Sequence, residues 1–150
     1  MKKDTLLVTP INCPLIGDVQ IPSDKSMSHR AVMLGSICNG KLLIKNFSSS
    51  EDCRSTVKIL QQLGIEIEFV SDETLLVNGK GLRGFKEPDN VLDCGNSGTT
   101  IRMMMGILSG QPFYSVVTGD NSLVKRPMGR VVKPLKAMGA NILGKNNSTL

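Results

Sequence analysis

The sequence predicts a mixed α/β (α+β) fold in which one supersecondary unit is used twice. Segments with the apolar spacing of amphipathic helices alternate along the chain with short strand-like segments. The segments 58–67 and 133–142 also carry lysine, leucine, glycine and isoleucine at matching positions. A unit of strand, helix, strand, helix and two paired strands accounts for both observations, although a similarity this weak can also arise by chance.

The first copy of the unit is expected over residues 17–80. Its elements, after a short strand at 5–8, are a strand at 17–21, a helix at 26–37, a strand at 41–47, a helix that follows the serines at 48–50, and strands at 65–70 and 74–77. Asn39-Gly40 stops the first helix, whose apolar residues include Met27, Ala31, Leu34 and Cys38. Serines followed by acidic residues start the second helix, and Gly64 is the expected residue after its C-cap. The polar pair 71–72 predicts a hairpin turn.

The second copy is expected over residues 88–150, after a loop at 80–90 that contains two glycines and a proline. Its elements are a helix at 97–108, a strand at 113–118, a polar connection at 119–126, a helix at 127–138 and the beginning of a strand at 141–143. Pro127 suits the first position of the last helix, and Gly139 ends it. Because this copy is incomplete, we expect the chain to be the front portion of a longer protein.

Composition narrows the class of partner. The 150 residues are 40% hydrophobic, enough for one domain with a core, and the formal net charge is +5, which suits an anionic partner. Nucleic acid is a weaker candidate, because the cations are scattered and the chain has only four Phe, one Tyr and no Trp. Neither helix-turn-helix nor zinc-finger spacing is present.

The cysteines and the apolar runs exclude other classes. The four cysteines form no CxxC pair and there is a single histidine, which argues against a structural zinc site. We expect free, mostly buried thiols in a reducing compartment. The apolar run near the amino terminus is soon broken by polar residues and prolines, so it is no signal peptide. No apolar run reaches the ~20 residues of a membrane span.

The stretch from Asp93 to Arg102 is typical of a glycine-bearing turn that feeds into a helix. Gly95 and Gly98 allow close approach of the backbone to a ligand, and the two residues between them are N-cap candidates. The first turn of a helix has unpaired N–H groups and a partial positive charge, so it attracts anions. The alternative is a well-capped helix that binds no ligand.

Two further clusters, 24–30 and 125–126, place cations at expected helix starts, where the helix dipole disfavours them. An anion site would explain this placement, and a solvated basic turn is the alternative. His29 can be a general base, but a partly exposed helix residue is the favoured interpretation. The methionines Met103, Met104, Met105 and Met128 are expected to fill the core. Asp93 is expected to be structural, and no catalytic carboxylate pair, nucleophile triad or Walker motif can be assembled.

Three motifs together carry a family resemblance over essentially the whole chain. Asp-Lys-Ser-Met-Ser-His-Arg at 24–30, Gly-Asn-Ser-Gly-Thr-Thr-Ile-Arg at 95–102 and Lys-Arg-Pro-Met-Gly at 125–129 resemble the N-terminal signatures of 5-enolpyruvylshikimate-3-phosphate synthases. The resemblance implies transfer of the enolpyruvyl group of phosphoenolpyruvate to the 5-hydroxyl of shikimate 3-phosphate, with release of phosphate. It also implies a cytoplasmic enzyme of aromatic amino-acid biosynthesis that uses no metal or organic cofactor. We expect a monomer that binds neither nucleic acid nor membrane.

The implied fold is the inside-out barrel of the enolpyruvyl transferases, built from repeated βαβαββ units with buried helices and outer sheets. Residues 1–16 would be a crossing segment that pairs with the other, absent domain. Residues 17–150 would be part of the N-terminal domain, with a first repeat at 17–80 and an incomplete second repeat at 88–150. The remaining C-terminal part of the enzyme is then the expected partner of this chain.

The resemblance also implies roles for individual residues. Lys25 would touch both substrates and take part in catalysis. The implied shikimate 3-phosphate contacts are Lys25, Ser26 and Arg30, and the implied phosphoenolpyruvate contacts are Lys25, Asn96, Gly98, Thr99 and Arg126. Gly98 also matches the position where side-chain bulk affects the inhibitor glyphosate, and its glycine suggests a sensitive type. Met103 stands where some relatives carry proline, which suggests a slightly different helix start.

Other functions are separable from this one. The sibling UDP-N-acetylglucosamine enolpyruvyl transferase would show Lys-Asn at 25–26 and a cysteine in the loop 119–126, and this chain has neither. The isolated 1–150 portion is expected to be inactive, because the resemblance places further catalytic groups after Leu150. A binding-only fragment for shikimate 3-phosphate and a basic nucleic-acid-binding domain are the alternatives.

Overall fold

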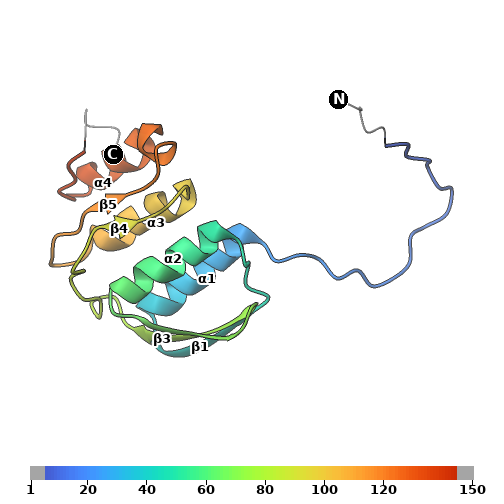
Figure 1. Ribbon diagram of the computed structural model, residues 1–150, viewed down its shortest axis with the longest axis horizontal. Coiled ribbons are helices and arrows are strands. Elements are labelled where there is room, and N and C mark those ends of the chain that lie inside the picture. Colours follow the sequence, from blue (N-terminus) through green and yellow to red (C-terminus); the bar gives the residue numbers. More distant parts are fainter. Residues whose placement is uncertain (1–5, 145–150) are drawn as a thin grey trace.

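The structure is a computed structural model that describes residues 6–144, and the mixed helix-and-strand fold is as predicted (Figure 1). The helices are α1 (Lys25–Ile37), α2 (Glu51–Gln62), α3 (Gly98–Leu108) and α4 (Gly129–Ala137), with a short 3-10 turn η1 (Leu123–Lys125). The strands are β1 (Asn39–Lys45), β2 (Glu66–Ser71), β3 (Thr74–Lys80), β4 (Leu92–Asp93) and β5 (Val117–Thr118). Residues 1–5 and 145–150, which include part of the strand expected at 5–8 and the end of the second repeat, lie outside the described residues.

The first unit is a three-stranded antiparallel sheet in the order β1-β3-β2, with α1 and α2 on one face (Figure 1). The predicted hairpin joins β2 to β3. Buried residues alternate with exposed or partly exposed ones along β3, where Leu75 and Val77 are fully buried. This alternation is typical of a sheet that is covered on one side only.

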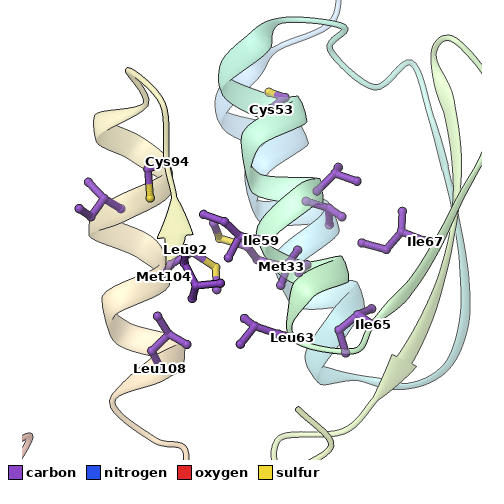
Figure 2. Packing of buried hydrophobic residues seen from close by; sticks show 14 of the residues in the cluster. Met33, Cys53, Ile59, Leu63, Ile65, Ile67, Leu92, Cys94, Met104 and Leu108 are labelled. Atoms are coloured by element: carbon purple, nitrogen blue, oxygen red, sulfur yellow. The ribbon is translucent and has the colours of Figure 1, made fainter. Parts of the chain in front are cut away.

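The main core lies between the helices. Ile59 of α2 and Leu63, the C-cap of that helix, lie opposite Met104 and Leu108 of α3, with Leu92 of β4 beside them (Figure 2). All five are buried. Met105 and Met128 are also buried and Met103 packs against the same cluster, so the methionines fill the core as predicted.

Helices α2 and α4 end in the same way. Gly64 and Gly139 adopt positive φ angles of 85° and 99°, which cost glycine little. The next amide donates back to the helix in each case, from Ile65 to the carbonyl of Leu60 and from Ala140 to that of Leu135, both at 3.0 Å. These are Schellman motifs, so the two glycines end their helices as the sequence predicted.

Several expected strands are wrong or shorter than expected. Residues 6–8 and 17–21 form no strand, and the chain before α1 extends away from the body (Figure 1). Strand formation needs a partner edge, and none lies beside these residues in the part of the chain that the structure describes. The strand expected at 113–118 shrinks to β5, and 141–143 is irregular. The parallel partner of β5, the short strand β4, was not predicted.

Two helix details also differ from expectation. Pro127 precedes α4, whose N-cap is Met128, instead of occupying the first helical position. In α1, Met27 and Leu34 are 62% and 57% exposed, whereas the polar residues Ser28 and His29 are buried. The buried face of α1 is therefore partly polar because its hydroxyl and imidazole groups find hydrogen-bond partners on other elements.

The cysteines are free, as expected, but only Cys53 and Cys94 are buried, whereas Cys13 and Cys38 are exposed. Burial, with a smaller contribution from Asp93, raises the pKa of the Cys94 thiol to about 12.

Within residues 6–144, no cluster of histidine, cysteine and acidic side chains is suited to hold a metal ion. Among the same residues, no helix has the length and hydrophobicity needed to cross a membrane.

Candidate functional site

The amino end of α1 has an acidic N-cap residue and exposed basic side chains in the turns that follow it. Asp24 is the N-cap, and its Oδ1 accepts from the Met27 amide at 2.6 Å. The first turn itself contains no acidic residue, so Lys25 and Ser26 occupy it with exposed side chains. Lys25 Nζ lies 3.4 Å from Asp52 Oδ2 of α2, and 58% of the Lys25 side chain remains exposed. A pair this exposed contributes little to stability, so Lys25 stays available to a ligand.

The amino end of α3 is formed by the predicted glycine-bearing turn. Gly95 has a φ of 56°, and its amide donates to Asp93 Oδ1 at 2.8 Å, which gives Asp93 the structural role expected of it. Ser97 is the N-cap and accepts from the Thr100 amide at 3.1 Å. Thr99 is exposed on the first turn. The Asn96 side chain takes no part in the cap and is therefore free to contact another segment.

Asn96 contacts the segment that carries Arg126. Arg126 Nη2 donates to Asn96 Oδ1, and Asn96 Nδ2 donates to Asp120 Oδ2, each at 2.6 Å. The other oxygen of Asp120 accepts from the Ser122 and Leu123 amides at the start of η1. The hydrogen bond from Asn96 is the largest of several effects that hold the pKa of Asp120 below its usual value. Asp120 therefore remains charged and keeps the Asn96 amide turned with its oxygen toward Arg126.

Gly98 lies beneath two guanidinium groups. A Cβ atom on Gly98 would sit 2.6 Å from Nη1 of Arg102 and 3.1 Å from Nη1 of Arg126. Arg102 also donates to the Gly98 carbonyl at 3.2 Å and to the Pro127 carbonyl at 3.5 Å. The ion pairs found within residues 6–144 involve neither arginine. Two positive charges therefore accompany the N–H groups of α3, an arrangement that suits a carboxylate or phosphate.

A buried chain of polar groups joins the two halves of the site. His29 Nδ1 of α1 lies 2.7 Å from Thr56 Oγ1 of α2, and Thr56 Oγ1 lies 2.7 Å from Thr100 Oγ1 of α3. The Lys25 end of α1 and the Gly98 end of α3 are thus gathered at one corner of the molecule, as the sequence predicted. The expectation that His29 is partly exposed is wrong, because only 2% of this residue is exposed. Its ring contacts Thr56 of α2. The periodicity of apolar residues along α1 could not predict this contact, because it says nothing of which helix packs beside α1.

Burial lowers the pKa of His29, the nearby Lys25 adds to this effect, and Asp52 opposes it. The imidazole is therefore mainly neutral at neutral pH. With Nδ1 bonded to Thr56 inside the core, His29 is better suited to hold helices together than to exchange protons with a ligand at the surface.

Comparison with known proteins decides the family. The model of the family described as "EPSP synthase (3-phosphoshikimate 1-carboxyvinyltransferase)" matches residues 10–150. The chain belongs to this family. A 3-phosphoshikimate 1-carboxyvinyltransferase of Bacillus cereus is 55% identical over 149 residues, which cover 99% of this chain and 34% of that protein. One of Pelotomaculum thermopropionicum is 54% identical over 136 residues, which cover 91% of this chain and 32% of that protein.

A solved structure of EPSP synthase from Acinetobacter baumannii superposes with a TM-score of 0.84 at 41% identity, and the match covers 89% of this chain and 30% of that one. The fold is therefore that of part of an EPSP synthase. The chain spans about a third of the length of the curated relatives that it matches.

The sequence motifs did not reveal the residues that hold the candidate site residues in place. Asp52, Thr56, Thr100, Arg102 and Asp120 were all missed as contributors to the site. Asp120 carried a weak signal, because an acid two residues before a serine in a polar connection is typical of a side chain that caps a turn. Thr56 carried none, since its partners are distant in sequence.

Proposed function

We propose that this chain supplies part of the substrate-binding site of a 3-phosphoshikimate 1-carboxyvinyltransferase. The reaction transfers the enolpyruvyl group of phosphoenolpyruvate to the 5-hydroxyl of shikimate 3-phosphate and releases phosphate. The observation that carries the proposal is the convergence of Arg126, Arg102 and the amino end of α3 around Gly98, a site for an anion. Both substrates are anions, and Lys25 lies on the neighbouring helix end.

The proposed contacts divide between the two helix ends. Lys25, Ser26 and Arg30 bind shikimate 3-phosphate, and phosphoenolpyruvate is bound by Lys25, Asn96, Gly98, Thr99 and Arg126. Arg126 suits a planar carboxylate or a phosphate because its guanidinium can donate two parallel hydrogen bonds. Lys25 acts as a compact positive charge at the junction of the two substrates, where it stabilises charge that develops during transfer. We propose no metal and no organic cofactor, because these cations and amides supply the positive charge.

The same proposal gives this chain a partner. Leu6, Leu7, Leu15 and Ile16 are each more than 85% exposed, and such a run of apolar side chains needs cover. We propose that residues 1–16 pair with the remaining C-terminal part of the enzyme and that 17–150 belong to the N-terminal domain. The isolated 1–150 portion is then inactive, and the complete enzyme is a cytoplasmic monomer.

The proposed function is tested by assaying turnover with the protein that the full reading frame encodes. We expect phosphate release that requires both phosphoenolpyruvate and shikimate 3-phosphate, with no product when UDP-N-acetylglucosamine replaces the latter. Lys25→Ala and Arg126→Ala should each lower kcat/KM at least about tenfold, as expected for a lost charged contact. Lys41→Ala, on the exposed surface of β1, is the matched control for the loss of one positive charge.

Absence of turnover with shikimate 3-phosphate, or near-normal kinetics in both site variants, would count against the proposal. Calorimetric titration of the 1–150 portion distinguishes the remaining alternatives. Heat on addition of shikimate 3-phosphate without turnover supports a binding portion of the enzyme. Salt-sensitive retention of DNA together with indifference to shikimate 3-phosphate would favour a nucleic-acid-binding domain.

A further inference from the structure

Helix α2 contributes none of the proposed ligand contacts, yet it packs against both helices that do. The polar side chain that it presents to both neighbours is Thr56, which is fully buried. Its hydroxyl lies 2.7 Å from His29 Nδ1 and 2.7 Å from Thr100 Oγ1. His29 is on the first turns of α1, directly before Arg30. A single hydroxyl group therefore links the two helix ends across α2.

The chain of hydrogen bonds continues to the cap of α3. Thr100 Oγ1 lies 2.7 Å from the Oγ of Ser97, and Ser97 Oγ accepts from the Thr100 amide. The Asp52 carbonyl lies 3.2 Å from Thr100 Oγ1 and 3.4 Å from Thr56 Oγ1, so it also faces both threonines. Any shift of α2 along its axis would break bonds at both ends of this chain, because hydrogen bonds weaken steeply with distance and angle.

Apolar packing does not supply the same constraint. The contacts of Ile59 and Leu63 with α3 are non-directional and tolerate small sliding of one helix past another. The polar chain is also buried, and Thr56, Ser97 and Thr100 are each at most 1% exposed. In such surroundings a satisfied network specifies one arrangement, since every alternative leaves a polar group without a partner.

We propose that Thr56 is a positioning residue, which sets the separation between the amino ends of α1 and α3 through His29 and Thr100. This inference rests on the proposed function, because the two helix ends matter together only if one site uses both. Thr56 touches no substrate. Its effect reaches the ligand through the backbone of Gly98 and Thr99, which directly follow the N-cap Ser97.

The test compares three variants in the full reading frame. Thr56→Val removes the hydroxyl at nearly constant volume, and Thr56→Ser keeps it. Ser36→Ala is the matched control, because Ser36 is a fully buried residue of α1 whose hydroxyl donates only to the Val32 carbonyl of its own helix. We expect Thr56→Val to raise the KM for phosphoenolpyruvate about fivefold, a change typical of one lost buried hydrogen bond. Thr56→Ser and Ser36→Ala should stay within about twofold of the parent protein.

A merely structural role would lower the melting temperature of Thr56→Val and Ser36→Ala alike and leave both KM values unchanged, and that result would overturn the inference. The Thr56→Val, Thr100→Val double variant should cost less than the sum of its single variants, because both remove the same link. If the effects of the two single variants simply add up in the double variant, Thr56 and Thr100 do not act through a shared hydrogen bond.

A second readout does not depend on turnover. The amide resonances of Gly98 and Thr99 should shift in Thr56→Val and remain unchanged in Ser36→Ala. If the parent protein neither turns over nor binds shikimate 3-phosphate, the proposed function fails, and these resonances still decide the positional claim. Unchanged resonances in Thr56→Val would refute it.

Discussion

Arg126 donates a hydrogen bond from Nη2 to the amide oxygen of Asn96 across 2.6 Å, although thirty residues separate them along the chain. The amide is not free to rotate, because its nitrogen donates to Asp120. The Asn96 side chain thus holds the turn before α3 and the segment 120–126 in one orientation. The family resemblance implied only a ligand contact for this residue. Asn96 therefore positions Arg126 in addition to the ligand contact proposed for it.

Asp120→Asn tests this orientation. The new amide can still accept from the Leu123 amide at the start of η1, but it can also present a nitrogen to the nitrogen of Asn96. Asn96 would then turn or lose its partner, and Arg126 would lose a fixed acceptor. We expect the KM for phosphoenolpyruvate to rise at least about fivefold, in line with a lost charge-assisted hydrogen bond. This KM is measured by steady-state kinetics on the protein that the full reading frame encodes.

Asp72→Asn is the control for the loss of one acidic group. Asp72 is an exposed residue of the turn between β2 and β3 and is not among the proposed ligand contacts. It should leave KM unchanged. If Asp120→Asn behaves like Asp72→Asn, the Asp120 carboxylate does not orient Asn96.

The sequence was sufficient for features that depend on near neighbours. The glycines that follow α2 and α4 could be recognised from the residues next to them in the sequence. Gly64 and Gly139 take the positive φ angles that such helix ends require. The cap of α3 was found for the same reason, since Ser97 and its partner Thr100 lie within one turn. The site's cations were noticed because charge at a helix start contradicts the dipole rule.

Features that depend on distant partners escaped prediction. His29 was expected to be partly exposed because nothing in its vicinity along the chain reveals Thr56, which is 27 residues away. Met27 and Leu34 were treated as ordinary apolar positions of α1, although they are exposed. The strand expected at 17–21 failed because strand formation requires a partner edge, which propensity cannot supply.

Gly98→Ala should affect binding more than folding. The added methyl would meet the ends of Arg102 and Arg126, at 2.6 and 3.1 Å from their Nη1 atoms. Both side chains are flexible, so they can move away without disturbing the backbone. We expect the melting temperature to change little, while displacement of the guanidinium of Arg126 raises the KM for phosphoenolpyruvate by about tenfold or more, as expected for a weakened charged contact.

Gly106→Ala is the matched substitution for Gly98→Ala. Gly106 lies in the same helix, is exposed, and a Cβ there would have no atom within 4 Å. Kinetics should be unchanged, and the free energy of unfolding should rise by about 0.5–1 kcal/mol because alanine favours a helix over glycine. Equal KM values for the two variants would show that the arginines near Gly98 are not part of the site.

Gly79→Ala should damage the fold itself. Gly79 lies in β3, where an added Cβ would overlap the backbone carbonyl oxygens of Gly35 and Cys38 at the end of α1. Backbone atoms cannot swing aside as the arginine side chains can, so α1 would have to move away from the sheet. We expect a loss of about 3 kcal/mol in the free energy of unfolding, at the upper end for overpacking. Urea denaturation measures it, with Gly106→Ala as the control, and a loss close to zero would show that α1 is not seated against β3.

Stability should fall as the solution is acidified, and His29 should be responsible for part of that fall. Burial lowers the pKa of His29 from its ordinary value of 6.5, with Lys25 adding to the effect and Asp52 opposing it. A lowered pKa means that the unfolded chain binds a proton more readily than the folded one between the two pKa values. Stability therefore rises with pH across that window. The contribution is complete above pH 6.5 and is lost as pH falls through the folded pKa.

The chain has a single histidine, so its imidazole resonance can be followed by NMR without assignment. We expect its midpoint below 6.5, and His29→Asn should flatten the pH dependence of unfolding near pH 6. Asn is chosen because its amide can still bond to the Thr56 hydroxyl but does not titrate. A midpoint above 6.5 would mean that the attraction of Asp52 outweighs burial, and the stability profile would then slope the other way, with the histidine stabilising the fold when it is charged.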